Sequence, residues 1–423
     1  MLDIKRLREE SDSLRGIIEA RGGQLDGVLD ADQKRRQLLS EVEALKGERN
    51  AVSKEIGKLK KAGEDTEAQQ AEMRALGQKI SGLDDDVRAA EADFNDRILR
   101  IPNIPHSSVP LGADEAANEV VRVHGEARAF DFKPETHIEI GERLGLFDLA
   151  RATRMTGAGF PLFIGSGARL ERGLINFMLD LHVKEHGYTE MSPPFVVNSD
   201  SMTGTGQLPK MAEDMYRTTG DDLWLIPTAE VPVTNYYREE VIEADLPIYL
   251  TAYTPCFRRE AGAAGRDTRG LLRVHQFDKV EMVKFVEPET SYDELESLLL
   301  NAEDVLQRLG LHYRVLNLCS GDISFAAAKC YDIEVWAPGQ DAWLEVSSCS
   351  NFEDFQARRA KIRYRNRDGK TRFVHTLNGS GVALPRLVVA LLETYQRADG
   401  SIEIPEAIVP YMDGVTVLSP AGE

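Results

Sequence analysis

The feature that most constrains this chain is a proline-free stretch between about residues 28 and 98, in which apolar residues recur at heptad spacing. The first register consists of Leu38, Val42, Leu45, Val52, Ile56 and Leu59, and the second of Met73, Leu76, Ile80, Leu83, Val87, Ala90 and Phe94. Alternating steps of three and four are typical of a coiled-coil seam. Because a turn-forming run at 62–65 separates the registers, the pattern predicts an N-terminal antiparallel two-helix coiled-coil arm, in which each helix reaches roughly 50 Å.

The charge of this arm is uneven, whereas the whole chain is acidic. A formal net charge of −19 repels nucleic acid on average, so any contact with RNA needs local basic patches. Residues 33–61 include nine basic and four acidic side chains. Two interpretations stay open: a solvated helix face with intrahelical ion pairs, or a set of phosphate contacts. The candidate contacts come from Lys46, Arg49, Lys54, Lys58, Lys60 and Lys61, of which the first four are selected as RNA contacts.

After the prolines at 102 and 105, which end the arm, strand-like and helix-like segments are interspersed. The strand-like segments are 189–197, 223–226, 249–259, 272–286, 313–318, 333–336 and 342–347, and the helix-like ones are 137–150, 169–186, 292–309, 352–364 and 384–396. This pattern predicts the α+β class, with an antiparallel β-sheet flanked by helices. The expected domains are 1–105 and 106–423, and 107–125 is expected to be a loop-rich linker.

Several other classes of protein and site are disfavoured by the sequence. No run of about 18 apolar residues and no N-terminal targeting pattern is present, so we expect an untargeted chain with no membrane part. The four cysteines lack C-x-x-C spacing, which fits isolated thiols in the cytoplasm. Neither a P-loop, nor G-x-G-x-x-G, nor a metal-ligand spacing occurs.

One predicted hairpin has an unusual composition. Arg258 and Glu260 fall on one face at the end of its first strand, and Phe277, Lys279 and Glu281 share one face of its second strand. Such a surface suits a ligand with an anionic phosphate, a planar base and a cationic amine. The alternative is a surface ion-pair network beside a core phenylalanine. The long connecting loop favours a functional site.

Three further clusters carry candidate chemistry. The run 228–230 places a hydroxyl and a carboxylate two residues apart, and the run 345–348 places polar groups at the end of an alternating strand. Glycines in the run 377–381 permit close backbone approach to a ligand. The following helix should begin near Ala383 or Leu384, because Pro385 is tolerated only in a first helical turn. Each cluster taken alone is also typical of a turn or helix cap.

Together these residues resemble the seryl-tRNA synthetases, a class II family of aminoacyl-tRNA ligases. The resemblance covers the whole chain, from the arm to the tail at 404–406. The matching segments are 172–194 (similar to motif 1, which forms the family's dimer interface), 257–281 (motif 2), 345–359 and 378–386 (motif 3). Leu384-Pro385 departs from the family, where valine and glycine are common, but leaves Arg386 in place. The missing zinc-ligand pattern argues against the metal-dependent archaeal form.

The resemblance implies a serine--tRNA ligase that activates serine with ATP and Mg²⁺ and transfers it from seryl-adenylate to tRNA(Ser), and also to tRNA(Sec), as a cytoplasmic homodimer. It implies catalytic roles for Arg258 and Arg386. The implied serine-binding residues are Thr228, Ala229, Glu230, Glu281 and Ser380. The implied ATP-binding residues are Arg258, Arg259, Glu260, Val274, Phe277, Glu345, Val346, Ser347, Ser348 and Arg386. The implied RNA contacts are Lys46, Arg49, Lys54 and Lys58 on the arm and Arg266 and Arg269 on the long loop.

The resemblance also implies that Glu345 and Ser348 hold the metal ion. Their odd spacing puts them on opposite faces of a regular strand, so ligation by both needs a β-bulge or a strand end there. Two other functions were weighed. A ligase that loads amino acids onto carrier proteins is expected to lack the long arm, and a non-catalytic coiled-coil protein is expected to have lost Arg258, Glu345 or Arg386.

Overall fold

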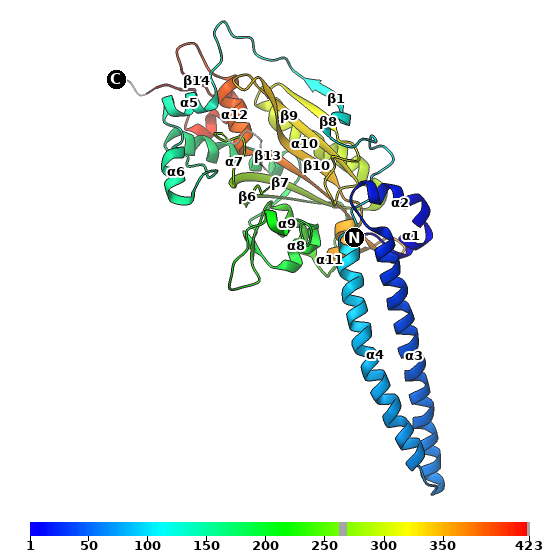
Figure 1. The fold of residues 1–423 in the computed structure, drawn as a ribbon. Helices are drawn as coiled ribbons and strands as arrows, with labels where there is room; N and C mark the ends of the chain where they lie inside the picture. The colour runs from blue at the N-terminus through cyan, green and yellow to red at the C-terminus, as the bar shows by residue number, and fades with distance from the viewer. Residues whose placement is uncertain (262–268, 421–423) are drawn as a thin grey trace. The chain divides into compact units, whose positions relative to one another are not determined.

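The computed structural model describes residues 1–261 and 269–420, and the chain falls into two compact units, Met1–Pro102 and Asn103–Glu423 (Figure 1). The proposed RNA contact Arg266 lies outside the described residues. No helix within the described part of the chain is long and apolar enough to cross a membrane.

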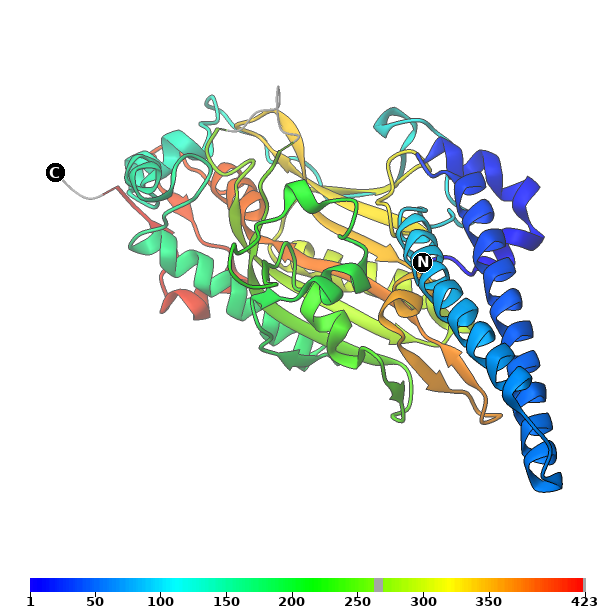
Figure 2. The same ribbon diagram turned by 60° about the horizontal axis from the view of Figure 1, so that its bottom comes forward.

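The first unit is entirely helical. Two short helices, α1 (Ile4–Glu9) and α2 (Ser11–Ala20), precede the long helices α3 (Leu25–Ala62) and α4 (Glu67–Leu99). The long helices run antiparallel, in blue and cyan in Figure 2. Gly63 ends α3 in the left-handed conformation, with φ of 74°, which glycine adopts without steric cost. The predicted coiled-coil arm is confirmed.

An apolar seam holds the two long helices together. Its most buried members toward the tip are Leu45, Val52, Ile56, Leu76 and Ile80. Two ion pairs cross it, Lys46–Asp84 at 3.1 Å and Lys79–Glu41 at 3.6 Å. Exposed ion pairs contribute little to stability, about 0–1 kcal/mol each. The apolar seam, which follows the predicted registers, therefore supplies most of the stabilisation.

An eight-stranded sheet organises the second unit and confirms the α+β class (Figures 1 and 2). In spatial order its strands are β1 (Glu119–His124), β8 (Tyr313–Asn317), β9 (Lys329–Ala337), β10 (Ala342–Asn351), β13 (His375–Ala383), β7 (Gln276–Val286), β6 (Ile248–Phe257) and β2 (Thr189–Met191). All neighbours pair antiparallel except β2, which runs parallel to β6.

The side chains of strand β7 point alternately toward the two faces of this sheet. Its Val280 and Met282 side chains belong to the main hydrophobic core, with residues of α7 (Ser166–Lys184), α10 (Ser291–Arg308) and α12 (Leu384–Thr394). Its Val283 and Phe285 side chains belong to a second core, with residues of α9 (Glu230–Thr234) and α11 (Phe355–Ala360). Because strand side chains alternate, the odd-numbered residues from Phe277 onward face away from the main core.

The remaining elements are short. The helices are η1 (Glu115–Ala117), α5 (His137–Leu144), α6 (Leu149–Thr156), α8 (Ser199–Thr205), η2 (Ala212–Asp214), η3 (Asn235–Tyr237), η4 (Pro288–Thr290) and η5 (Glu406–Met412). The strands are β3 (Val196–Val197), β4 (Trp224–Leu225), β5 (Val241–Ile242), β11 (Arg363–Arg365), β12 (Thr371–Phe373), β14 (Ile402–Glu403) and β15 (Val417–Leu418).

Three expectations about these segments were wrong. The helix expected at 137–150 is broken into α5 and α6 by Gly145, whose φ of 62° is left-handed. The helix expected at 352–364 stops at Ala360, because Lys361 takes φ of 57° and β11 follows. The expected linker at 107–125 contains η1 and the edge strand β1, whose side chains are all exposed and so lack an alternating apolar pattern.

Candidate active site

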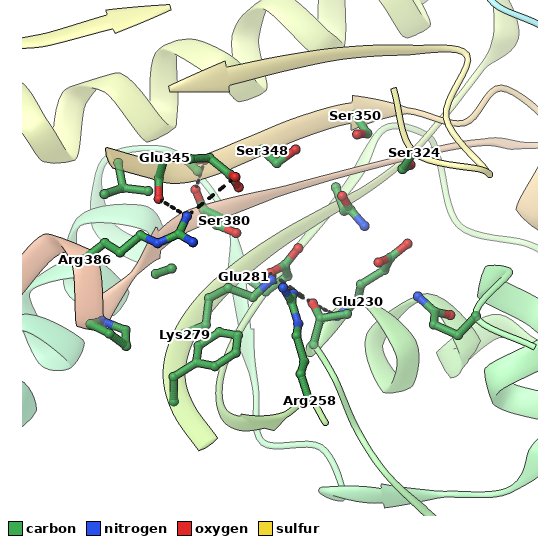
Figure 3. A pocket seen from close by; sticks show the side chains of 18 of the residues that line it. Glu230, Arg258, Lys279, Glu281, Ser324, Glu345, Ser348, Ser350, Ser380 and Arg386 are labelled. Atoms are coloured by element: carbon green, nitrogen blue, oxygen red, sulfur yellow. Dashed lines mark hydrogen bonds and ion pairs between the residues drawn. The ribbon is translucent and has the colours of Figure 1, made fainter. Parts of the chain in front are cut away.

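One cavity of about 460 Å³ collects most of the sequence-predicted site residues (Figure 3). Those lining it are Thr228, Glu230, Arg258, Glu260, Val274, Phe277, Glu281, Glu345, Val346, Ser347, Ser348, Ser380 and Arg386. Two predicted residues lie outside this described lining: Ala229 is fully buried, and the backbone N–H of Arg259 donates to the Asp214 carbonyl at 2.9 Å. Arg269 is exposed and is also outside the lining.

Arginine and aromatic groups meet at the hairpin of β6 and β7. Arg258 directly follows β6, and its guanidinium carbon lies 5.1 Å from the centre of the Phe277 ring. Its Nε donates to the Pro227 carbonyl at 3.3 Å. Glu260 has φ of 51°, so the chain has left the strand geometry there, and its Oε2 accepts from Arg273 Nη1 at 2.5 Å. The hairpin thus offers a cation, an aromatic ring and a carboxylate to one ligand.

A compact polar cluster forms the centre of the cavity. Lys279 Nζ lies 2.5 Å from Glu281 Oε2 and 2.8 Å from Thr228 Oγ1. The Thr228 hydroxyl donates to Glu281 Oε2 at 3.3 Å and accepts from the Glu230 backbone N–H at 3.2 Å. Ser380 on β13 is the register partner of Glu281 on β7. Carboxylates and hydroxyls this close together can bind a small molecule that has both an ammonium and a hydroxyl group.

The Glu230 carboxyl has a raised pKa. Burial, followed by the negative charge of Glu281, raises the pKa of Glu230 to about 7. Gln356 opposes this rise, because its Nε2 donates to Glu230 Oε1 at 2.6 Å, and the Lys279 ammonium opposes it as well. A cationic ligand beside Glu230 would favour the ionised carboxylate.

A β-bulge shapes the other end of the cavity. On β10, Glu345 pairs with Glu334 of β9 but Ser347 pairs with Ile333, so one extra residue is accommodated between them. The bulge reverses the alternation, and Glu345 and Ser348 both line the cavity (Figure 3). This is the irregularity that joint ligation by the two residues requires.

The residues at this end fit a divalent cation. A carboxylate and a hydroxyl supply the oxygen ligands that Mg²⁺ prefers. Burial and the negative charge of Glu345 hold the pKa of Asp332, the register partner of Ser348, well above its usual range. A cation would relieve that repulsion. Within residues 1–261 and 269–420, no group of three or more His, Cys, Asp or Glu residues is placed to hold a metal, so Glu345 and Ser348 would share the ion with ligands of other kinds, such as water or phosphate oxygens.

Arg386 joins this end of the cavity to the long loop. Helix α12 begins at Leu384 with Pro385 in its first turn, as predicted, and Arg386 follows. The Arg386 Nη1 donates to the Glu345 carbonyl at 2.9 Å and lies 3.6 Å from Glu345 Oε2, and its Nε donates to the Leu272 carbonyl at 3.1 Å.

Comparisons with known proteins assign the family. Residues 1–105 match the model of the seryl-tRNA synthetase N-terminal domain, and residues 213–395 match that of the tRNA synthetase class II core domain (G, H, P, S and T). A relative from Carboxydothermus hydrogenoformans, named serine--tRNA ligase, is 58% identical over 416 residues, or 97% of this chain and 98% of the relative. This chain belongs to the seryl-tRNA synthetase family. The resemblance stated from the sequence is confirmed, and the chain is a class II aminoacyl-tRNA ligase.

Two solved structures extend the comparison. The crystal structure of seryl-tRNA synthetase from Pyrococcus horikoshii complexed with ATP matches with a TM-score of 0.92 and 38% identity over 100% of both chains. The crystal structure of A. aeolicus tRNASec in complex with M. kandleri SerRS matches with a TM-score of 0.58 and 20% identity, covering 82% of this chain and 70% of that one, which shows a shared fold. The seryl-tRNA synthetase family and the ATP complex together make this chain an ATP-binding ligase.

Sequence reasoning gave no role to several residues that line the cavity. Lys279 was noted on the hairpin, but its contact with Thr228 joins residues 51 positions apart. The segments 205–207 and 324–326 also line the cavity and form no sequence motif. Gly206 takes φ of 99° at the end of α8, and a glycine often marks such a helix end, but the sequence pattern predicts no helix before it.

Proposed function

We propose that this ligase activates serine with ATP to form seryl-adenylate and then transfers the seryl group to the 3′ end of tRNA(Ser). The observation that carries the proposal is the polar cluster of Thr228, Lys279 and Glu281, which lies in one cavity with Arg258 and Arg386. The ammonium and hydroxyl groups of serine complement the polar groups of this cluster, and the two arginines complement the phosphates of a nucleotide.

In the first step, a serine carboxylate oxygen attacks the α-phosphorus of ATP, and pyrophosphate leaves. This reaction needs little proton transfer, so the protein acts mainly by positioning and charge stabilisation. Arg258 would contact both the serine carboxylate and the α-phosphate. The Phe277 ring and Arg386 would stack on the two faces of adenine, with Glu260 at its edge and Arg386 also near the γ-phosphate.

Val274, Val346 and Ser347 line the cavity and would pack against ATP. Glu345 and Ser348 would hold Mg²⁺, which supplies positive charge to the phosphate oxygens when bound. In the second step, a 3′-terminal hydroxyl of the RNA attacks the carbonyl of the adenylate, and AMP leaves.

Serine would be selected by its two polar groups. Thr228 and Glu230 would take the ammonium group, and Glu281 and Ser380 would bond the hydroxyl. A site built around a buried hydrogen bond rejects an analogue without the bonding group, because the carboxylate is then left unpaired. Alanine should therefore be a poor substrate, and threonine should be excluded by size.

ATP–pyrophosphate exchange tests this function directly. Exchange should depend on serine and should be at least about 100-fold weaker with alanine at equal concentration. Glu281→Ala should lower serine-dependent exchange while ATP still binds. Arg367→Ala, at an exposed position away from the cavity, is the matched control and should behave as the wild type. Unchanged exchange in Glu281→Ala would contradict the assignment of the serine hydroxyl.

RNA recognition is assigned to residues 1–105 and activation to 106–423. Lys54 and Lys58 are exposed on α3, Arg49 is half-buried, and Lys46 already pairs with Asp84. tRNA(Sec) is a second candidate substrate, since the related M. kandleri SerRS is seen with tRNASec. Replacing residues 33–94 by a short linker should leave serine-dependent exchange within about twofold and lower charging of tRNA(Ser) about 30-fold or more through lost phosphate contacts. Equal losses in both reactions would contradict this division.

We also infer that the chain is a homodimer through 172–194. The strand in this segment, β2, lies at the edge of the eight-stranded sheet, and Val183 on α7 is exposed. Phe195 and Val196, directly after the segment, are also exposed. Unpaired strand edges and grouped apolar side chains favour association. Sedimentation velocity at micromolar concentration should give a dimer, and a fully active monomer would contradict it. The cytoplasmic location stays a prediction.

A further inference from the structure

A fully buried carboxylate joins three elements of the fold. Glu393 lies on α12, the helix that carries Arg386, and none of its side chain is exposed. Its Oε1 accepts from the His137 backbone N–H at 2.9 Å, from His137 Nδ1 at 3.0 Å and from Gln340 Nε2 at 2.9 Å. Its Oε2 accepts from the backbone N–H groups of Gly339 at 2.9 Å and Gln340 at 3.1 Å. Five donors thus converge on one side chain.

These donors come from two other elements. His137 is the first residue of α5, and residues 339–340 form the turn between β9 and β10, the strand that carries Glu345. A buried carboxylate near the C-terminal end of a helix is unfavourable both for solvation and for the helix dipole. An apolar side chain of similar volume could pack at this position without the cost of burying a charge. The carboxylate therefore indicates a role beyond packing.

The His137 ring connects Glu393 to the long loop between β6 and β7. Because the Glu393 oxygen can only accept, the proton of the ring lies on Nδ1. His137 Nε2 therefore presents a lone pair, and it accepts from the Leu271 backbone N–H at 3.1 Å. His137 and Leu271 are both fully buried. Gly270 takes φ of 61°, and a Cβ there would overlap His137 Nε2, so the backbone approaches the ring as closely as glycine allows.

The segment held by this bond is a wall of the nucleotide end of the cavity. Leu271, Leu272, Arg273 and Val274 all line it. The Leu272 carbonyl accepts from Arg386 Nε at 3.1 Å, and the Arg273 guanidinium donates to Glu260 at 2.5 Å. The segment is therefore fixed at three successive residues, and the bonds of Leu272 and Arg273 lead to Arg386 and Glu260, which are assigned to ATP.

We propose that His137 and Glu393 are positioning residues for the nucleotide. They fix one tautomer of the ring, and through it the Leu271 N–H, so that the 271–274 wall, Arg386 and Glu345 keep the spacing that ATP requires. The inference rests on the proposed function, because it assumes that ATP occupies this end of the cavity. Serine recognition should be nearly independent of the pair, since Lys279 holds Thr228 and Glu281 in place.

Two substitutions of one residue separate positioning from packing. In His137→Asn the amide can still donate to Glu393 but is too short to reach Leu271. In His137→Gln the side chain can reach Leu271 with an acceptor. In serine-dependent exchange by the full chain, the Asn variant should raise KM for ATP about tenfold, as expected when a buried N–H loses its partner. The Gln variant should stay within about threefold of the wild type. KM for serine should change by less than about twofold in both.

Equal effects of the two variants on KM for ATP, or equal changes in KM for ATP and for serine, would overturn the proposal and leave a packing role. Thermal unfolding is measured alongside. If the Asn variant does not fold, Glu393→Gln carries the test. In either orientation its amide nitrogen would face N–H donors that the carboxylate accepts from, so the hold on His137 and on the 339–340 turn would be weakened. KM for ATP within about twofold of the wild type in that variant would also overturn the proposal.

Failure of the proposed function can be distinguished from failure of the positioning role. If the wild-type chain shows no serine-dependent exchange, the function is wrong. If the wild type is active and the variants do not separate ATP from serine, only the positioning role is wrong.

Discussion

In the helical unit, Lys46 and Asp84 form an ion pair at 3.1 Å with side chains 44% and 38% exposed, whereas in the second unit Lys279 and Glu281 form one at 2.5 Å with side chains 7% and 2% exposed. Water and salt screen the first pair, so either partner can be lost at little cost. The second pair is desolvated, and removing one partner leaves a buried charge unpaired. Substitutions of charged residues in the arm should therefore have small effects that depend on salt concentration. Substitutions of charged residues in the cavity should have large effects.

The largest effect expected from this contrast is that of Lys279→Met. Without the ammonium, Glu230 and Glu281 are neighbouring buried carboxylates that share no cation. Breaking a buried pair destabilises the fold by about 3–5 kcal/mol. Because the same ammonium holds Thr228 and Glu281 in place, kcat/KM for serine in exchange should fall roughly 100-fold or more. Lys46→Met makes the same change in the exposed pair and should leave exchange within about twofold. Similar losses in both variants would show that burial does not govern the response.

A smaller effect is expected from pH, and it again depends on burial. Because the pKa of Glu230 is raised to about 7, this carboxyl is mostly protonated at pH 6 and mostly ionised at pH 8. Only the ionised form can pair with the serine ammonium, so protons compete with serine. KM for serine should rise about tenfold per pH unit below 7 and level off above it.

The measurement is KM for serine in exchange between pH 5.5 and 8.5 at saturating ATP. Glu230→Gln is the control, because its side chain cannot ionise, and its KM should be high and independent of pH. At saturating serine, kcat should not depend on pH over this range, since the bound ammonium keeps Glu230 ionised. A wild-type KM that stays flat between pH 6 and 8 would rule out this competition.

The same contrast explains what could be predicted from the sequence. The arm is specified by local periodicity, so both registers and the turn at Gly63 were predictable from residues close together in the chain. The helix breaks at Gly145 and Lys361 were missed, because a left-handed residue inside an otherwise helical pattern leaves little trace in apolar spacing. No strand is predicted for β13, because His375–Ala383 contains two glycines and few β-branched residues, yet this segment forms a strand within the sheet.

The site was predictable only as far as motifs carry information. Glu345 and Ser348 are an odd number of positions apart, so ligation of one ion by both predicts a bulge between them. Strand β10 contains this bulge. The contacts that tune the groups were not predictable. Gln356 reaches Glu230 across 126 positions, and His137 reaches Glu393 across 256. Such partners become visible only when the fold brings distant segments together, and no local pattern marks them.

The smallest effect should come from the exposed lysines of the arm. Lys54 and Lys58 lie one turn apart on α3 and are both exposed, so they can reach successive phosphates of an RNA backbone. Each lost phosphate contact should reduce the slope of log affinity against log salt by about one, so Lys54→Ala with Lys58→Ala should reduce it by about two. At moderate salt this amounts to a several-fold weaker affinity for tRNA(Ser), with serine-dependent exchange unchanged. Lys79→Ala removes one positive charge from α4, where the ammonium lies 3.6 Å from Glu41, and should change the slope by less than about half a unit, against about one for each α3 lysine. If the α4 variant changes the slope as much as the α3 pair, the RNA does not distinguish the two helices, and the basic side of the arm has no special role.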